Sequence, residues 1–110
     1  AVRLPADWAN AECYFEKGAD RDVWDFALTS VAAVMKVSGG TIEDARIACG
    51  AVECVPSRLE AVEDAIRGQQ RSAELGARAG ELGVEGARPL NYNNFKVPLM
   101  ANLVARAVRG

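Results

Sequence analysis

The chain has 110 residues, half of them hydrophobic and a quarter charged, which is enough for one domain with its own core. Its net charge is −2 and its isoelectric point is about 5.1, so it lacks the basic surplus typical of a nucleic-acid-binding domain. It contains no histidine, which excludes Ser-His and Cys-His catalysis and removes the commonest metal ligand.

The three cysteines indicate a structural role and not a metal site. Cys13, Cys49 and Cys54 are odd in number and form no C-x-x-C pair, whereas a zinc site usually takes four ligands. We expect them to be small buried side chains in a reducing compartment. No signal peptide is visible, and no apolar run approaches the ~20 residues of a membrane span. The cytoplasm is therefore the default location, without insertion into a membrane.

The first half of the chain is predicted to contain three antiparallel strands. Residues 1–11 look like an extended lead-in, and because the chain begins without Met we expect a fragment of a longer polypeptide or a chain with its initiator removed. Residues 12–17 form the first strand. Residues 29–38 and 41–54 form a hairpin, because apolar side chains alternate along it and Gly39-Gly40 supplies the positive φ angles of a two-residue turn.

The second half is predicted to be helical. Ser57 can form a capping box with Glu60, which starts a first helix that ends at Gly68. A second helix covers residues 72–85, where several glycines let another element approach closely, and a third begins near residues 94–96. We expect the carboxylates of the first helix to form a cap and a solvated face: Glu60, Glu63 and Asp64.

Strands followed by helices predict the α+β class, with the helices on one face of the sheet. The expected architecture is a single domain, residues 1–110, in which a three-stranded antiparallel sheet packs against about three helices in the order β-β-β-α-α-α. The sequence has no P-loop, no G-x-G-x-x-G and no G-x-S-x-G motif, so nothing indicates catalysis by this chain alone.

The loop before the hairpin carries the candidate binding residues. Trp24 and Phe26 flank Asp25, and an aromatic ring can stack on a planar ligand while a carboxylate accepts hydrogen bonds from ring or ribose donors. Lys17 and Arg21 can contact an anion. Because large aromatic side chains are mostly buried, the residues alone favour the alternative that both rings seal the end of the core and that the acid caps the strand.

Short motifs follow one another along nearly the whole chain: Phe15-Glu16-Lys17, Arg21, Asp25-Phe26-Ala27-Leu28, Ser30-Val31-Ala32, Gly39-Gly40, Ala45-Arg46-Ile47-Ala48, Gly50-Ala51-Val52, Pro56-Ser57-Arg58, Gly86-Ala87-Arg88-Pro89-Leu90 and Asn94-Phe95-Lys96-Val97. In their order and spacing they resemble the C-terminal domain of the FAD-binding (medium) subunit of molybdenum hydroxylases. These are the relatives of carbon monoxide dehydrogenase, xanthine dehydrogenase and aldehyde oxidase.

The resemblance implies a sandwich of three antiparallel strands and helices that covers the flavin side of the subunit. Two preceding FAD-binding domains, which this sequence does not include, would hold most of the FAD and its diphosphate, so the chain alone should bind FAD weakly or not at all. Lys17, Asp25 and Phe26 occupy positions that resemble flavin-neighbouring residues, and Trp24 is adjacent. The implied partners are those two domains and the iron–sulfur and molybdopterin subunits, from which the flavin receives electrons.

Two other functions stay open. One is a non-enzymatic module that dimerises or docks a partner. The other is the interface domain of a disulfide or NADH reductase, although such domains usually supply a His-Pro or Cys element and this chain has no His. Glycine-rich phosphate loops upstream in the reading frame would favour the flavoprotein.

Overall fold

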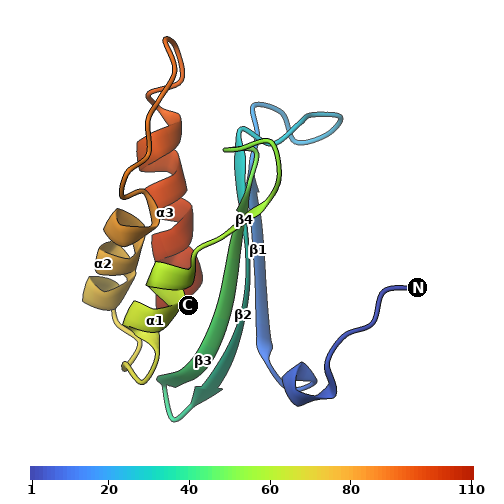
Figure 1. Ribbon diagram of the computed structural model, residues 1–110, viewed down its shortest axis with the longest axis vertical. Helices are drawn as coiled ribbons and strands as arrows, with labels where there is room; N and C mark the ends of the chain where they lie inside the picture. Colours follow the sequence, from blue (N-terminus) through green and yellow to red (C-terminus); the bar gives the residue numbers. More distant parts are fainter.

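The computed structural model describes residues 1–110 and contains one antiparallel sheet with helices on one of its faces (Figure 1). The four strands hydrogen-bond in chain order: β1 (Glu12–Gly18), β2 (Thr29–Ser38), β3 (Thr41–Gly50) and β4 (Ser57–Arg58). The helices are α1 (Glu60–Ile66), α2 (Ala73–Gly83) and α3 (Lys96–Arg109). The α+β class and the three helices are confirmed, but the sheet has four strands and not the three that we predicted.

The hairpin of β2 and β3 forms as the alternation of apolar residues predicts. Gly39 and Gly40 make its turn with φ angles of 55° and 82°, a region that side chains with a Cβ rarely enter. The return strand ends at Gly50 and not at residue 54, because Ala51 adopts a φ of 62° and turns the chain out of the ladder. Inward side chains of the hairpin are buried and belong to the core: Val31, Ala33, Met35, Ile42, Ala45, Ile47 and Cys49.

The fourth strand replaces the capping box that we predicted at Ser57. Ser57 pairs with Cys49 in β4, and its hydroxyl donates to the carboxylate of Glu53 at 2.9 Å instead of capping a helix. Helix α1 begins three residues later, at Glu60, without a side-chain cap. The prediction is wrong because two extended residues are too few to show the period of a strand.

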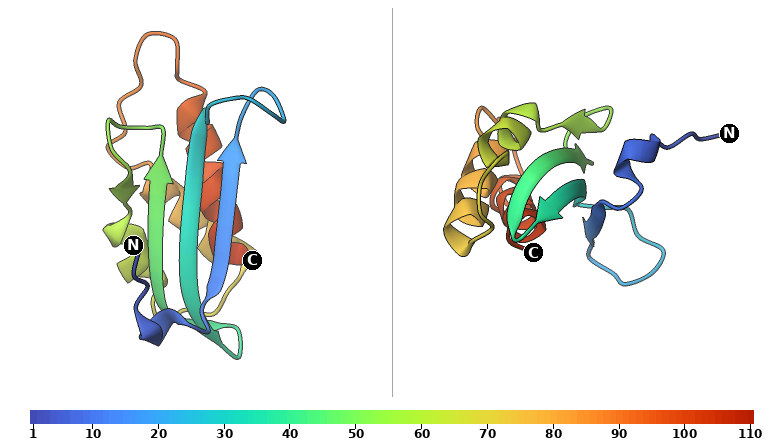
Figure 2. Two further views of the ribbon diagram at one scale, coloured as in Figure 1. Left: turned by 90° about the vertical axis from the view of Figure 1, so that its right-hand side faces the viewer. Right: turned by 90° about the horizontal axis from the view of Figure 1, so that it is seen from below.

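The helices form two layers over the sheet, as the two views at right angles show (Figure 2). Helix α3 packs on β2 and reaches β1, α1 packs on β3, and α2 packs outside them against α3 and α1. Close contact between α2 and α3 depends on small residues: a Cβ at Gly76 would lie 2.8 Å from the carbonyl oxygen of Ala105, and one at Gly80 would clash with the carbonyl of Ala101. The close approach predicted from the glycines of the second helix is confirmed.

Two groups of residues differ in burial from what we expected. Cys49 is buried, which raises the pKa of its thiol, and its Sγ donates to the carbonyl of Ser57 at 3.5 Å. Cys13 and Cys54 are exposed, so the expectation that all three cysteines are buried is wrong. Glu63 is only 2% exposed and does not lie on a solvated face, because its carboxylate accepts the backbone N–H of Ile47 at 2.9 Å.

The N-terminal segment turns beneath the face of the sheet that no helix covers. Residues Ala6–Trp8 form a 3₁₀ turn and not a uniformly extended lead-in. The ring of Trp8 lies 4.6 Å from the ammonium of Lys36 and 5.1 Å from the guanidinium of Arg46, which both project from this face. No helix of the structure is long and apolar enough to span a membrane.

Candidate functional site

The candidate residues lie in the loop that joins β1 to β2, at the end of the sheet opposite the Gly39-Gly40 turn (Figure 1). The backbone N–H of Leu28 donates to the carbonyl of Gly18 at 2.7 Å and closes the base of the loop. Strand β1 precedes this segment and the hairpin of β2 and β3 follows it. The sheet therefore fixes both ends of the loop, and the tip of the loop lies in solvent.

Polar side chains within the loop fix its backbone. The Oδ2 atom of Asp25 accepts the N–H groups of Asp20 at 2.9 Å and of Arg21 at 3.0 Å. The ammonium of Lys17 donates to the carbonyl of Asp25 at 2.6 Å, and the guanidinium of Arg21 donates to the carbonyl of Trp24 at 2.6 Å. Each polar group therefore closes a ring of backbone, and the loop has a defined shape without any core of its own.

The two aromatic side chains at the tip point into solvent. Trp24 is 94% exposed and Phe26 is 93% exposed. The alternative that these rings seal the end of the core is therefore wrong. Trp24 also has a φ of 54°, a left-handed conformation that costs a non-glycine residue roughly 1–2 kcal/mol. The loop thus keeps a strained backbone and two unburied rings, a combination that folding alone does not explain.

The four predicted residues divide into two kinds in the structure. Trp24 and Phe26 present free aromatic surface that can lie against a flat ligand. Lys17 and Asp25 hold the loop, because the ammonium and the carboxylate are engaged in the hydrogen bonds given above. All four residues lie in or beside the same loop. The sequence analysis missed the role of Arg21, whose guanidinium donates to the carbonyl of Trp24. No sequence signal distinguishes that contact from the contact with an anion that we considered.

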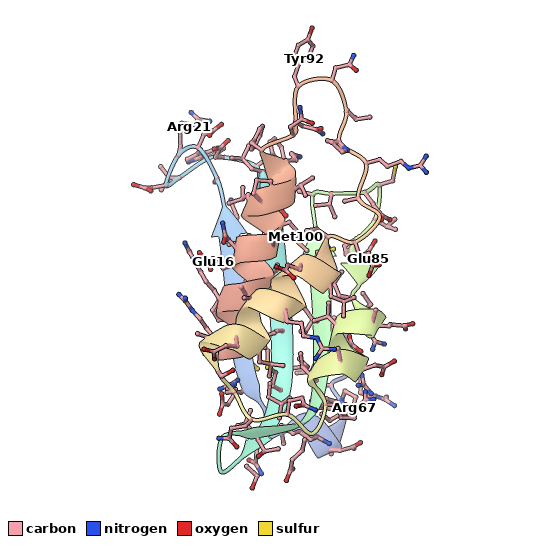
Figure 3. All side chains as sticks on the ribbon, turned by 90° about the vertical axis from the view of Figure 1, so that its left-hand side faces the viewer. Glu16, Arg21, Arg67, Glu85, Tyr92 and Met100 are labelled. Atoms are coloured by element: carbon pink, nitrogen blue, oxygen red, sulfur yellow. The ribbon has the colours of Figure 1, made fainter.

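The loop is a convex surface that lies apart from a cavity of the domain. That cavity has a volume of about 420 Å³ and lies between the segment after β3 and the segment between α2 and α3, with Arg58, Val84, Arg88 and Met100 in its lining. None of the four candidate residues lines it. Arg21 and Tyr92 lie on two separate loops at this end of the molecule (Figure 3). A convex loop can cover one face of a ligand, and another body has to supply the remaining walls.

The residues of the loop fit one part of FAD. Two exposed rings suit the flat isoalloxazine system, which an aromatic side chain can cover by stacking. The diphosphate would need a cradle of backbone N–H groups, typically a glycine-rich turn at the start of a helix. The loop continues into strand β2 and not into a helix, so it fits the ring and offers no such cradle.

Fold and loop together define a small α+β domain whose β1–β2 loop presents two exposed aromatic rings. The chain belongs to the family described as the CO dehydrogenase flavoprotein C-terminal domain, whose sequence model matches residues 14–110. No individual curated protein matches the sequence significantly.

Solved structures have the same fold. Quinoline 2-oxidoreductase from Pseudomonas putida 86 superimposes with a TM-score of 0.84 and 28% identity over 98% of this chain and 37% of that chain. Carbon monoxide dehydrogenase from Hydrogenophaga pseudoflava gives a TM-score of 0.79 and 27% identity over 89% of this chain and 35% of that chain. Reconstituted CO dehydrogenase from Oligotropha carboxidovorans, at 19% identity and a TM-score of 0.77 over 87% of this chain and 35% of that one, shares the fold. The chain therefore spans little more than a third of the length of these proteins.

Proposed function

We propose that this chain is the flavin-side domain of an FAD-containing electron-transfer subunit of a molybdenum hydroxylase. Its β1–β2 loop lies against the isoalloxazine ring in the complete subunit. Membership of the CO dehydrogenase flavoprotein C-terminal domain family supports the class of protein. The observation that carries the site is the nearly complete exposure of Trp24 and Phe26 on a loop whose backbone is fixed by hydrogen bonds.

A fixed loop favours such a contact energetically. Ordering a flexible loop on binding costs roughly 0.5–1.5 kcal/mol for each side chain that is immobilised. The carboxylate of Asp25 already accepts the N–H groups of Asp20 and Arg21 in the folded chain. The loop is therefore ordered during folding, and binding does not have to order it. Covering the two aromatic rings then removes apolar surface from water, at about 25 cal/mol for each Å².

Each loop residue has a separate role in this proposal. Trp24 stacks against the ring or its edge, and Phe26 excludes water beside it. Lys17 holds the carbonyl of Asp25, and the carboxylate of Asp25 holds the turn before Trp24, so both are positioning residues. When bound, the FAD supplies the redox chemistry, while the domain orients and shields it.

The partners follow from the same family. We propose that the remainder of the subunit holds the diphosphate and the adenosine of the FAD, since the β1–β2 loop fits only the ring. We further propose that the subunit works in a complex with iron–sulfur and molybdopterin subunits, which supply the electrons. Residues 1–110 act as one domain of that subunit and catalyse nothing alone.

The test is a Trp24→Ala substitution in the complete flavoprotein subunit. We expect a shifted flavin absorption band and altered reoxidation, because the ring loses its neighbour. Tyr92→Ala is the matched control, since Tyr92 is as exposed as Trp24 but lies on the segment between α2 and α3. Identical flavin spectra and turnover in the wild type and in Trp24→Ala would contradict the proposal.

A further inference from the structure

The face of the sheet opposite the helices carries a row of three apolar side chains, two of them alanines, that no helix covers. Phe15 of β1 pairs with Ala32 of β2, and Ala32 pairs with Ala48 of β3, so the three side chains lie side by side across the sheet. Phe15 is 68% exposed, and Ala32 is exposed although it is in a central strand. We call this surface the open face; Figure 2 (left) looks directly onto it.

One end of the open face is already occupied. The 3₁₀ turn brings Trp8 against Lys36 and Arg46 near the Gly39-Gly40 end of the strands. The ring of Trp8 therefore lies against both charged groups in cation–π geometry and covers this end of the face. The other half, around Ala32, has no cover from this chain. It is the half nearer the β1–β2 loop, since residues 15, 32 and 48 lie toward that end of their strands.

The β1–β2 loop projects on the same side of the molecule as the open face. In Figure 1 the helices lie on one side of the sheet, whereas the loop tip and the N-terminus both lie on the other. A body that contacts the tip of the loop from that side lies on the same side of the sheet as Ala32. A face of small side chains allows another sheet or helix to approach closely, and Phe15 supplies a protruding anchor of the kind that dominates interfaces.

We propose that the open face is the surface by which this domain docks onto the flavin-holding part of the same subunit. The inference rests on the proposed function and adds the docking surface. The family is a C-terminal domain, so the rest of a member's chain comes before it. The chain spans 37% of the quinoline 2-oxidoreductase chain, which leaves ample polypeptide as occupant. The N-terminal segment of this chain lies on the side of the open face (Figure 1).

The native Cys13 provides a direct test. It is exposed and projects from the open face next to Phe15, in the row of Val34 and Arg46. The complete subunit is treated with a maleimide and the labelled peptides are quantified. The control is a thiol introduced by Ala77→Cys on the exposed side of α2, away from the sheet. We expect Cys13 to react more slowly than the control thiol by at least about tenfold, because labelling requires the interface to open. Equal rates overturn the proposal.

A second pair of variants separates this inference from the proposed function. Ala32→Arg places a long cation on the open face, and Ala77→Arg places the same side chain on α2. We expect Ala32→Arg to loosen the docked domain, with about tenfold greater solvent exchange at β2 amides that the partner covers, and Ala77→Arg to leave exchange unchanged. If Ala32→Arg has no effect while Trp24→Ala still shifts the flavin spectrum, the docking surface is wrong and the flavin contact stands.

The alternative occupant of the open face is a second copy of this chain. It would protect Cys13 in the 110-residue chain by itself, and the protection would fade on dilution. That result overturns the proposal, whereas rapid labelling of Cys13 in the chain alone and slow labelling in the complete subunit support it. If Cys13 is labelled slowly in the complete subunit but Trp24→Ala leaves the flavin spectrum unchanged, the docking surface stands and the flavin contact is wrong.

Discussion

The carboxylate of Glu63 on α1 receives two N–H groups from the guanidinium of Arg58 on β4. Arg58 Nε lies 3.1 Å from Oε1, and a second guanidinium nitrogen bonds Oε2. The same Oε1 also accepts the backbone N–H of Ile47 at 2.9 Å. Strand β4 pairs only with Cys49 and Ala48, so Ile47 is the first residue on that edge without a strand partner for its N–H group. A buried carboxylate thus takes the place of the missing strand.

Replacing this carboxylate should destabilise the domain. Glu63→Ala leaves the N–H group of Ile47 buried and unpaired and removes the hydrogen-bond partner of Arg58. We expect a loss of about 2–3 kcal/mol in the free energy of unfolding, because a hydrogen bond to a charged group contributes roughly 1.5–3 kcal/mol. The charge of Arg58 adds little more, since that side chain is 47% exposed and stays hydrated. Urea unfolding followed by circular dichroism measures the change.

The control for Glu63 is Glu81→Ala on the exposed side of α2. Surface substitutions of this kind usually stay within about 0.5 kcal/mol. Glu63→Gln should fall between the two, because its amide oxygen can still accept from Ile47 but carries no charge. If the urea midpoints of Glu63→Ala and Glu81→Ala were equal, the hydrogen bonds of the Glu63 carboxylate would not stabilise the fold.

The sequence predicted the hairpin and the last two helices well, for a physical reason. Gly39-Gly40 between two alternating segments fits a tight turn and little else, and the glycines of α2 demand a close neighbour, which α3 supplies. Strand β4 and the burial of Glu63 escaped prediction together. A strand of two residues leaves no period, and a glutamate at a helical surface position normally faces water. Both features follow from the edge of the sheet, where β4 covers Ala48 and Cys49 and the carboxylate of Glu63 binds the next free N–H group, that of Ile47.

The segment that carries the candidate residues joins two strands as predicted, but the burial favoured for its aromatic residues is wrong. Statistics of burial place Trp24 and Phe26 in a core, whereas the structure exposes both. The left-handed backbone at Trp24 leaves no trace in the sequence either, since glycine or asparagine would be the usual signal. Neither the exposure of these rings nor the left-handed backbone can be predicted from composition or from the period of the apolar residues.

The phenol of Tyr14 gives a test of the contact between β1 and α3. Burial raises the pKa of Tyr14 from 10.0 to about 12, with further contributions from its hydrogen bond to Glu16 and from the charge of that carboxylate. The folded state therefore holds this proton more tightly than the unfolded state. Below pH 10 the stabilisation is complete, and it is lost as the pH rises through about 12.

Two variants separate the titration from other alkaline effects. Tyr92→Phe leaves Tyr14 as the sole tyrosine of the chain, so the tyrosinate absorbance should appear only near pH 12. Tyr14→Phe should remove part of the fall in stability between pH 10 and about 12. An absorbance midpoint near pH 10 in Tyr92→Phe would mean that Tyr14 is hydrated and free of Glu16.

The chain alone should bind FAD weakly or not at all. Its β1–β2 loop fits only the ring of the cofactor, and a convex loop supplies one wall of a site. Titration of FAD into the 110-residue chain, followed by flavin fluorescence and calorimetry, measures the affinity. We expect no saturation in the micromolar range, with Trp24→Ala as the control for any weak signal. A stoichiometric yellow complex would contradict the prediction and would mean that the chain holds the diphosphate as well.

The left-handed backbone of Trp24 should lower the free energy of unfolding of the domain, although we propose that the Trp24 ring serves the flavin contact in the complete subunit. Trp24→Gly removes both the ring and the strain at a φ of 54°, so the domain should gain about 0.5–1 kcal/mol, or roughly 4–8 °C in Tm for each kcal/mol. Ala51→Gly is the matched control, because Ala51 has a φ of 62° in a different loop and should show the same gain. In the complete subunit only Trp24→Gly should disturb the flavin spectrum. A loss of stability in Trp24→Gly, against a gain in Ala51→Gly, would instead mean that the exposed ring contributes contacts that hold the loop.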